Sequence, residues 1–525
     1  MATDLSVGSV PPYYREVYQI CSPNAETISK EVFTHLLVKS KLPSSTLSQI
    51  WTLIESKQGS LTRTNLYKAL VLIAFAQQGK QPDDKLLENF SGKELPRPEL
   101  GDLNELKAFM LQHTRHSNPT HLGLSYSDIC ELDSIEVTVI PEKKGLFLKH
   151  VEYQVLSKRR NSSVRRRYND FLSLYELLLG RFPYRLIPKL PPKKVVGVGL
   201  FVAADSHFIE ERRKSLRRWL TIVARHPVMM HDPMLDFFFT FSGPDAQNKI
   251  RESFRRVPDE FTTSELAAKA KELVPPDTHT EFANSRDQIR LIFSGVSRLK
   301  HIADLLAIRS HGYADNMAEF GSQLTNLAND PHGSSMWATG GSTVWADMKK
   351  GFHVISKEFG LLSTKALQRA VREEDEVCER LNLLLEVLGA HRDLCERHEK
   401  GVVHDHQRAL AKMLALKKRQ IQGVIKGTDA ESVEQMERKM MEQESVIANV
   451  DLRNAYALHC LHLETQLVHA HLEILASILN TLVAVQIQGH SELADVWRLI
   501  QPSIMKCLPD NKRQLNGSGP SGNSL

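Results

Sequence analysis

The stretch Arg165-Arg166-Arg167-Tyr168-Asn169-Asp170-Phe171 decides how the middle of this chain is interpreted. Three guanidinium groups end a strand-like run, and an aromatic ring follows at once. Arginine offers a planar set of donors that matches phosphate oxygens, and a tyrosine face can stack on an adjacent ring. The combination suits a phosphorylated, ring-shaped polyol. The alternative is a solvated basic turn, and the stretch taken alone favours that alternative.

The residues around this stretch predict a small sheet followed by helices. Residues 135–140 alternate apolar and polar side chains, residues 145–156 do so less regularly, and residues 163–167 supply a third strand. Apolar residues recur at helical spacing in two later segments. We therefore expect an α+β domain, with a three-stranded sheet plus helices, over residues 131–243.

Two further basic segments follow in the same region. They read Leu190-Pro191-Pro192-Lys193-Lys194 and Phe208-Ile209-Glu210-Glu211-Arg212-Arg213-Lys214. Together with the Arg-Arg-Tyr stretch, and in this order, they resemble the phox-homology (PX) domain of sorting nexins. The resemblance implies a site for phosphatidylinositol 3-phosphate. In that site Arg167 would bind the 3-phosphate, Tyr168 would stack on the inositol ring, Lys193 would reach the bilayer-side phosphate, and Arg212 would bind the ring hydroxyls.

An apolar loop is expected between the last two basic segments. Residues 195–202 mix glycines with apolar residues, which argues against both helix and paired strand. Exposed apolar patches usually mark an interaction surface. Our hypothesis is that Val196, Leu200 and Phe201 enter the headgroup region of a membrane. The alternative is that the loop folds back on its own core.

The N-terminal part predicts several short helices over residues 14–90, after a disordered start at residues 1–13. The run from Leu42 to Ile73 resembles an EH domain, a paired EF-hand module. This resemblance implies a groove for Asn-Pro-Phe peptides with Trp51 in it, although a core position for Trp51 is equally compatible. We expect residues 91–130 to be a linker with some helix.

Calcium chemistry is not expected in this module. With Gly59 as the sixth residue of the loop, its first, third, fifth and twelfth positions are Ile54, Ser56, Gln58 and Asn65. Calcium requires several carboxylate oxygens and a bidentate glutamate at the last position. This loop offers neither.

The C-terminal half is predicted to be long amphipathic helices. A linker helix is expected over residues 244–275, three helices over 276–510, and a disordered tail over 511–525. Apolar residues recur at three-four spacing along each long helix, which predicts a three-helix bundle whose apolar faces need a partner. Following a PX domain, the bundle resembles a BAR domain, and this resemblance implies a crescent-shaped homodimer.

A basic cluster lies near the turn between the second and third long helices. It comprises Lys417, Lys418, Arg419 and Lys426. In a BAR dimer this turn forms the tip, where each base near an anionic surface contributes about 1 kcal/mol. The alternative is an ordinary solvated helix end, where bases complement the helix dipole.

The composition of the chain and its short motifs limit the kinds of partner and reaction that are expected. The 67 basic and 62 acidic residues nearly balance, so local clusters decide which partners bind. The six cysteines are scattered, which suggests a reducing compartment. His404 and His406 point to different sides of a predicted helix, so no metal site is expected there. We find no glycine-rich phosphate loop and no serine elbow, and we expect neither an enzyme nor a cofactor.

The order of these modules resembles the sorting nexin family over nearly the whole chain. This resemblance implies a multidomain, mainly α protein on the cytosolic face of early endosome membranes. It would bind phosphatidylinositol 3-phosphate as a homodimer and act in membrane remodelling and cargo sorting. The alternative is a helical scaffold that binds polyanions or nucleic acid without lipid specificity.

Overall fold

The computed structural model describes residues 10–22, 27–28, 30–54, 61–83, 95–101, 119–141, 151–193, 206–274, 277–329, 342–426 and 430–507, and a few single positions between them. The chain divides into two compact units, Met1–Leu124 and Ser125–Leu525.

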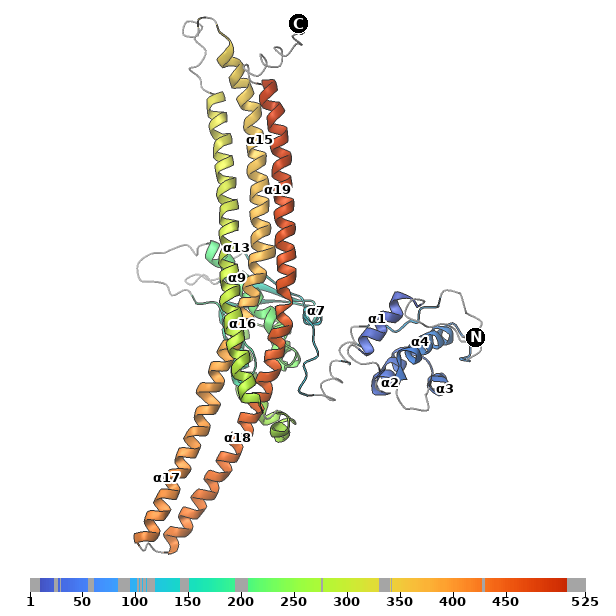
Figure 1. Cartoon of the computed structure of the whole chain (residues 1–525), viewed down its shortest axis with the longest axis vertical. Helices are drawn as coiled ribbons and strands as arrows, with labels where there is room; N and C mark the ends of the chain where they lie inside the picture. Colours follow the sequence, from blue (N-terminus) through green and yellow to red (C-terminus); the bar gives the residue numbers. More distant parts are fainter. Residues whose placement is uncertain are drawn as a thin grey trace, which may run out of the picture. The chain divides into compact units, whose positions relative to one another are not determined.

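The described part of the first unit contains four helices and one short strand pair (Figure 1). The helices are α1 (Pro12–Cys21), α2 (Lys30–Lys39), α3 (Ser44–Ile54) and α4 (Arg63–Gln77). Strands β1 (Thr27–Ile28) and β2 (Leu61–Thr62) pair antiparallel, with Ile28 opposite Leu61. Two helix pairs joined by one short ladder form a paired EF-hand module, which confirms the expected fold of this region.

The margins of this unit differ from the sequence expectation. The predicted disordered start includes Val10, which is buried in the core, and the first two residues of α1. In the predicted linker, Leu100 and Leu106 are buried in the same core. The Tyr14 hydroxyl donates to the Pro96 carbonyl at 2.6 Å. Leu103, Leu106 and Met110 recur at three-four spacing, which is compatible with the helix expected in the linker, but this spacing alone did not reveal that the segment packs on the unit.

The second unit contains a three-stranded antiparallel sheet in the order β3-β4-β5. The strands are β3 (Ile135–Val139), β4 (Glu152–Ser157) and β5 (Ser162–Arg167). The accompanying helices are α7 (Tyr126–Glu131), α8 (Tyr168–Arg181), α9 (Ser206–Ala224), the 3₁₀ turn η1 (Met229–His231) and α10 (Pro233–Thr240). Tyr153, Phe171, Trp219 and Phe238 fill the core with edge-to-face ring contacts.

The region expected to be one linker helix, residues 244–275, contains three short helical segments between residues 246 and 272. They are α11 (Ala246–Phe254), α12 (Glu260–Thr263) and the 3₁₀ helix η2 (Ala267–Glu272). Asp259 starts α12 by accepting a hydrogen bond from the Thr262 backbone. Phe261 and Ala270 are buried against Tyr456 and Val402 of the bundle, so this segment anchors the sheet domain to the helices.

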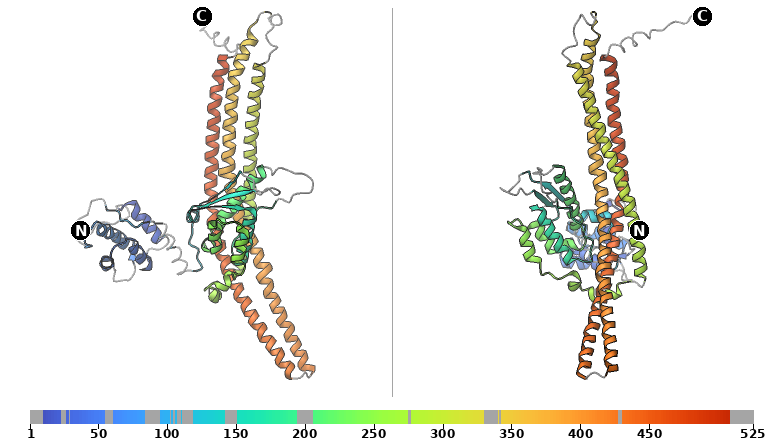
Figure 2. Two further views of the ribbon diagram at one scale, coloured as in Figure 1. Left: turned by 180° about the vertical axis from the view of Figure 1, so that it is seen from behind. Right: turned by 90° about the vertical axis from the view of Figure 1, so that its left-hand side faces the viewer.

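The C-terminal part is a three-helix bundle, as predicted (Figures 1 and 2). The first long helix is α13 (Thr278–Ala328). The second is α15 (Val344–Arg372), η3 (Glu373–Cys378), α16 (Glu379–His398), η4 (Glu399–Val403) and α17 (His404–Lys426), where η3 and η4 are π-helical turns. The third is α18 (Ala430–Leu472) and α19 (Ile474–Cys507). Helices α17 and α18 continue beyond α13 as a two-helix hairpin (Figure 2).

Candidate functional site

The three arginines at the end of β5 do not share one face of the strand, because Arg166 faces the opposite side from Arg165 and Arg167. Arg166 is buried, and its guanidinium donates to the Phe238 carbonyl at 3.0 Å and to the Phe241 carbonyl at 2.7 Å. Burial lowers the pKa of Arg166 to about 10. This corrects the sequence interpretation, in which all three guanidinium groups suited a phosphate. Successive strand residues face opposite sides, so Arg166 faces the core with Val164.

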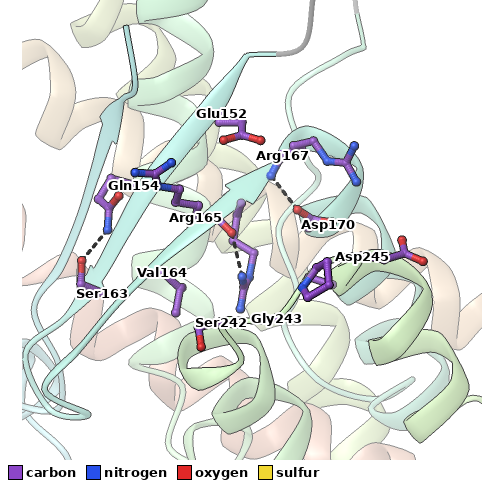
Figure 3. Close-up of a pocket in the computed structure, with 13 residues that line it drawn as sticks. Glu152, Gln154, Ser163, Val164, Arg165, Arg167, Asp170, Ser242, Gly243 and Asp245 are labelled. Atoms are coloured by element: carbon purple, nitrogen blue, oxygen red, sulfur yellow. Dashed lines mark hydrogen bonds between the residues drawn. The ribbon is translucent and has the colours of Figure 1, made fainter. Parts of the chain in front are cut away.

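Arg167 is held by its backbone, while its side chain remains available. Its N–H donates to the Asp170 carboxylate at 2.6 Å, at the start of α8. Burial raises the pKa of Asp170, and the Arg167 N–H and charge oppose that shift. The Arg167 guanidinium makes no hydrogen bond or ion pair with any residue that the structure describes. Together with Arg165, Glu152 and Asp245, it lines a cavity of about 650 Å³ (Figure 3).

Tyr168 and Arg212 lie against each other. The guanidinium carbon of Arg212 is 4.9 Å from the Tyr168 ring centroid and 4.4 Å from that of Phe208. The Arg212 Nε atom is buried and has no hydrogen-bond partner among the described residues. Burial raises the pKa of Tyr153, and the charge of Arg212 partly offsets this shift. A buried donor without a partner calls for an explanation, and an oxygen-rich ligand over the Tyr168 face would provide one.

Lys193 joins this group through the proline-rich segment. The Tyr168 hydroxyl donates to the Pro191 carbonyl at 2.6 Å, and Trp219 Nε1 donates to the Pro188 carbonyl at 2.8 Å. The exposed Lys193 ammonium is 3.4 Å from the side-chain oxygen of Asn169. The structure thus groups Tyr168, Lys193 and Arg212, with Arg167 next to Tyr168 in the chain. Val196, Leu200 and Phe201 lie outside the described residues.

The sequence reading missed two contributors to this site. Phe208 packs on Arg212 from one helical turn earlier, and Asn169 holds Lys193. The four-residue spacing of Phe208 and Arg212 on a predicted helix was an available signal. Arg213, by contrast, is held by Glu210 at 2.6 Å and by the Val137 carbonyl at 2.9 Å, so its role is structural.

The remaining predicted residues lie elsewhere. Trp51 is half-buried in the first unit, with its ring centroid 5.4 Å from that of Phe33. Lys417, Lys418 and Arg419 are exposed on α17. Lys426 is the last residue of that helix, and its side chain is not among those that the structure describes. Among the described residues, no group of three or more His, Cys, Asp or Glu side chains could hold a metal ion.

Three family models match the chain, in the order expected from the sequence. An EH domain matches residues 12–91, a PX domain matches residues 154–242, and a "Sorting nexin 8/Mvp1 BAR domain" matches residues 256–509. The segments 140–150 and 395–401 also resemble sorting nexin 8.

Proteins named sorting nexin-8 are similar in sequence to this chain. The chain is 46% identical to sorting nexin-8 of Mus musculus over 391 residues, which are 74% of this chain and 83% of that protein. It is 44% identical to sorting nexin-8 of Bos taurus over 391 residues, which are 74% of this chain and 84% of that protein. The cryo-EM structure of the SNX-BAR Mvp1 tetramer has the same fold, with a TM-score of 0.57 and 19% identity over 70% of this chain and 99% of that one. The chain therefore belongs to the sorting nexin family of PX–BAR proteins, which are non-enzymatic membrane-trafficking adaptors.

Proposed function

We propose that this sorting nexin binds phosphatidylinositol 3-phosphate through Arg167, Tyr168, Lys193 and Arg212. The observation that carries the proposal is the packing of Arg212 on Tyr168, with a buried guanidinium nitrogen that lacks a partner. An inositol ring stacked on Tyr168 would bring hydroxyl oxygens to that nitrogen. The unengaged Arg167 guanidinium, one residue away, would bind the phosphate as a bidentate partner.

The BAR bundle acts in this proposal as a homodimer. Large apolar side chains remain exposed on its three helices, among them Leu291, Ile308, Phe320, Leu479, Ile487 and Trp497. By length and composition, Glu434–Met505 includes a window apolar enough to cross a membrane, and only 28% of that window is buried within the single chain. A second copy of the bundle covers these faces better than lipid does, because polar residues interrupt them.

Dimerisation explains how a weak headgroup site would hold the protein on a membrane. Two headgroup pockets, two apolar loops at Val196, Leu200 and Phe201, and two basic ends act together. The second contact then forms at high effective concentration, which raises avidity by about 100-fold or more. Lys417, Lys418, Arg419 and Lys426 add attraction to anionic lipid. We propose the cytosolic face of early endosomes as the place of action, and cargo sorting with membrane remodelling as the role.

Co-sedimentation with vesicles tests the lipid specificity. The full chain is compared with Arg167→Ala and with Arg256→Ala, which removes the same charge from an exposed position outside the cavity. We expect Arg167→Ala to abolish the preference for vesicles carrying phosphatidylinositol 3-phosphate. Arg256→Ala is expected to retain that preference.

Two outcomes would contradict this proposal. One is equal recruitment of wild type and Arg167→Ala to vesicles with the 3-phosphate lipid. The other is binding that ignores the 3-phosphate and follows ionic strength alone, which would favour the polyanion-binding alternative. Titration of a labelled oligonucleotide onto the same proteins measures nucleic-acid binding directly.

The first unit supplies a surface for Asn-Pro-Phe peptides in this proposal, with Trp51 as the contact. The half-buried position of Trp51 supports this role, since its indole is not fully enclosed. Fluorescence anisotropy of a labelled Asn-Pro-Phe peptide on the full chain is expected to saturate, and Trp51→Ala is expected to lose that binding. Absence of saturable binding to wild type would leave Trp51 as a packing residue.

A further inference from the structure

Helix α17 carries an exposed row of apolar side chains. The row consists of Leu410, Leu414 and Ile421, which are 41%, 68% and 61% exposed. They are four and seven residues apart, so they lie on one face of the helix. We call this row the α17 stripe.

The packing face of α17 is a different one. Ala409 and Met413 are 7% and 6% exposed, and Gln443 of α18 donates to the Ala409 carbonyl at 3.0 Å. Each of these buried residues precedes a stripe residue by one position, which is about 100° around the helix. The contact between α17 and α18 is therefore complete without the stripe.

Two lysines share the exposed face with the stripe. Lys417 and Lys418 lie three and four residues after Leu414, and four and three residues before Ile421. Both are exposed, and neither makes a hydrogen bond or ion pair with any residue that the structure describes. An apolar row bordered by free lysines is typical of a helix that lies in the interface of an anionic membrane. Lysine can place its apolar stem along lipid while its ammonium stays at the headgroups.

The charge of the hairpin differs between its two helices. Helix α17 has six Lys and Arg against one Asp, a net charge of +5. The facing part of α18, residues 430–446, has two Lys and Arg against five Glu, a net charge of −3. An anionic surface therefore attracts the hairpin by its α17 side. An apolar row alone would not indicate lipid. The positive charge on the helix that carries the row favours an anionic membrane over a neutral partner.

We propose that the α17 stripe inserts into the headgroup region of an anionic bilayer, with Lys417 and Lys418 at the lipid phosphates. This proposal rests on membrane binding as the function, and it adds an apolar contact at the hairpin to the headgroup pocket of the PX domain. Electrostatic attraction brings the hairpin to the surface, and burial of the stripe keeps it there when salt screens the charges.

The test uses the full chain and vesicles that contain phosphatidylserine, with and without phosphatidylinositol 3-phosphate. The variant Leu414→Gln/Ile421→Gln replaces the two most exposed side chains of the stripe, keeps Leu410 and every charge, and introduces a good helix former. Its matched control is Met441→Gln, which removes a 70% exposed side chain from α18. We expect the stripe variant to bind at least about ten-fold more weakly at high salt. The Met441→Gln control is expected to bind like wild type.

Several readouts separate this proposal from its rivals. Equal high-salt binding of wild type and the stripe variant overturns it. Sedimentation velocity without lipid must give the same oligomer for both proteins, because a smaller species in the variant would assign the stripe to a contact between copies. The vesicles that lack the 3-phosphate lipid test the stripe independently of Arg167. Failure of the headgroup site and failure of the stripe are thus distinguishable.

Discussion

Arg185 and Glu464, which lie 279 residues apart in the chain, form a buried ion pair with an Nη1–Oε1 distance of 3.1 Å. Arg185 belongs to the PX domain and Glu464 to α18 of the bundle. Arg185 also binds Glu260 at 2.6 Å, and His226 lies 2.9 Å from Glu464. Burial would raise the pKa of Glu464, but His226 and Arg185 lower it to about 2. This network connects the PX domain to the bundle.

Removing one member of this network should destabilise the second unit. Glu464→Ala leaves Arg185 and His226 facing a vacated, buried position, and we expect a loss of about 3–5 kcal/mol in the free energy of unfolding of the second unit. The control is Lys189→Ala, because Lys189 is 67% exposed and pairs with Asp393 at 2.9 Å across the same interface. Its loss should be below about 1 kcal/mol. Urea unfolding measures both, and equal losses would contradict the assigned role of Glu464.

Glu386 should make the stability depend on pH. Burial raises its pKa from 4.5 to about 7, although Arg218 donates to it at 2.7 Å. The folded chain therefore binds this proton more tightly than the unfolded chain does. The stabilising contribution is complete below the unfolded pKa of 4.5 and is lost as the pH rises through about 7.

Glu386→Gln removes this dependence, because an amide does not ionise. From pH 4.5 to pH 7.5, wild type should lose on the order of 1–3 kcal/mol relative to the variant. Urea midpoints of both proteins across this range measure the difference. Parallel pH profiles for the two proteins would argue against a raised pKa at this position.

Two glycines of α13 should respond oppositely to alanine. A Cβ at Gly321 would lie 2.9 Å from the Ser356 carbonyl oxygen and 3.2 Å from the Cβ of Phe359, where α13 and α15 approach closely. Gly321→Ala should therefore destabilise the bundle by about 1–3 kcal/mol. Gly312→Ala meets nothing within 4 Å and should stabilise the helix by up to about 1 kcal/mol. Thermal unfolding measures both, and a neutral Gly321→Ala would mean that the helices separate easily.

The EF-hand-like loop should be independent of calcium. The side-chain amide of Asn65, at the twelfth loop position, donates to the Ile54 carbonyl at 3.1 Å, and the Lys68 ammonium donates to the Leu53 carbonyl at 3.1 Å. These bonds join the two ends of the loop without an ion. We expect the same unfolding temperature in millimolar calcium and in EDTA.

Asn65→Ala should lower the stability of the first unit by about 1 kcal/mol. Thr52→Ala is the control, because its hydroxyl bonds only within α3, to the Ser48 carbonyl at 2.9 Å. Thermal unfolding in the two buffers compares wild type with both variants. Stabilisation of wild type by calcium would show that the loop accepts an ion after all.

Several features followed from local sequence patterns. A third strand was expected at residues 163–167, where β5 lies, and three-four spacing located the long helices. The basic motifs picked out Tyr168, Lys193 and Arg212, which the structure groups together. The alternation of side chains along a strand already placed Arg166 on the side of Val164, so its inward direction was available from the sequence and was overlooked.

Other features required the tertiary structure. The packing of Leu100 and Leu106 on the first unit, the ring of Phe208 on Arg212, and the pairing of Arg185 with Glu464 join segments that no periodic pattern links. The sequence by itself determined which elements form and which of their faces are apolar, because those properties depend on neighbours two to four residues away. Only the folded chain decided which charges meet, because burial and pairing arise between residues that the chain order keeps far apart.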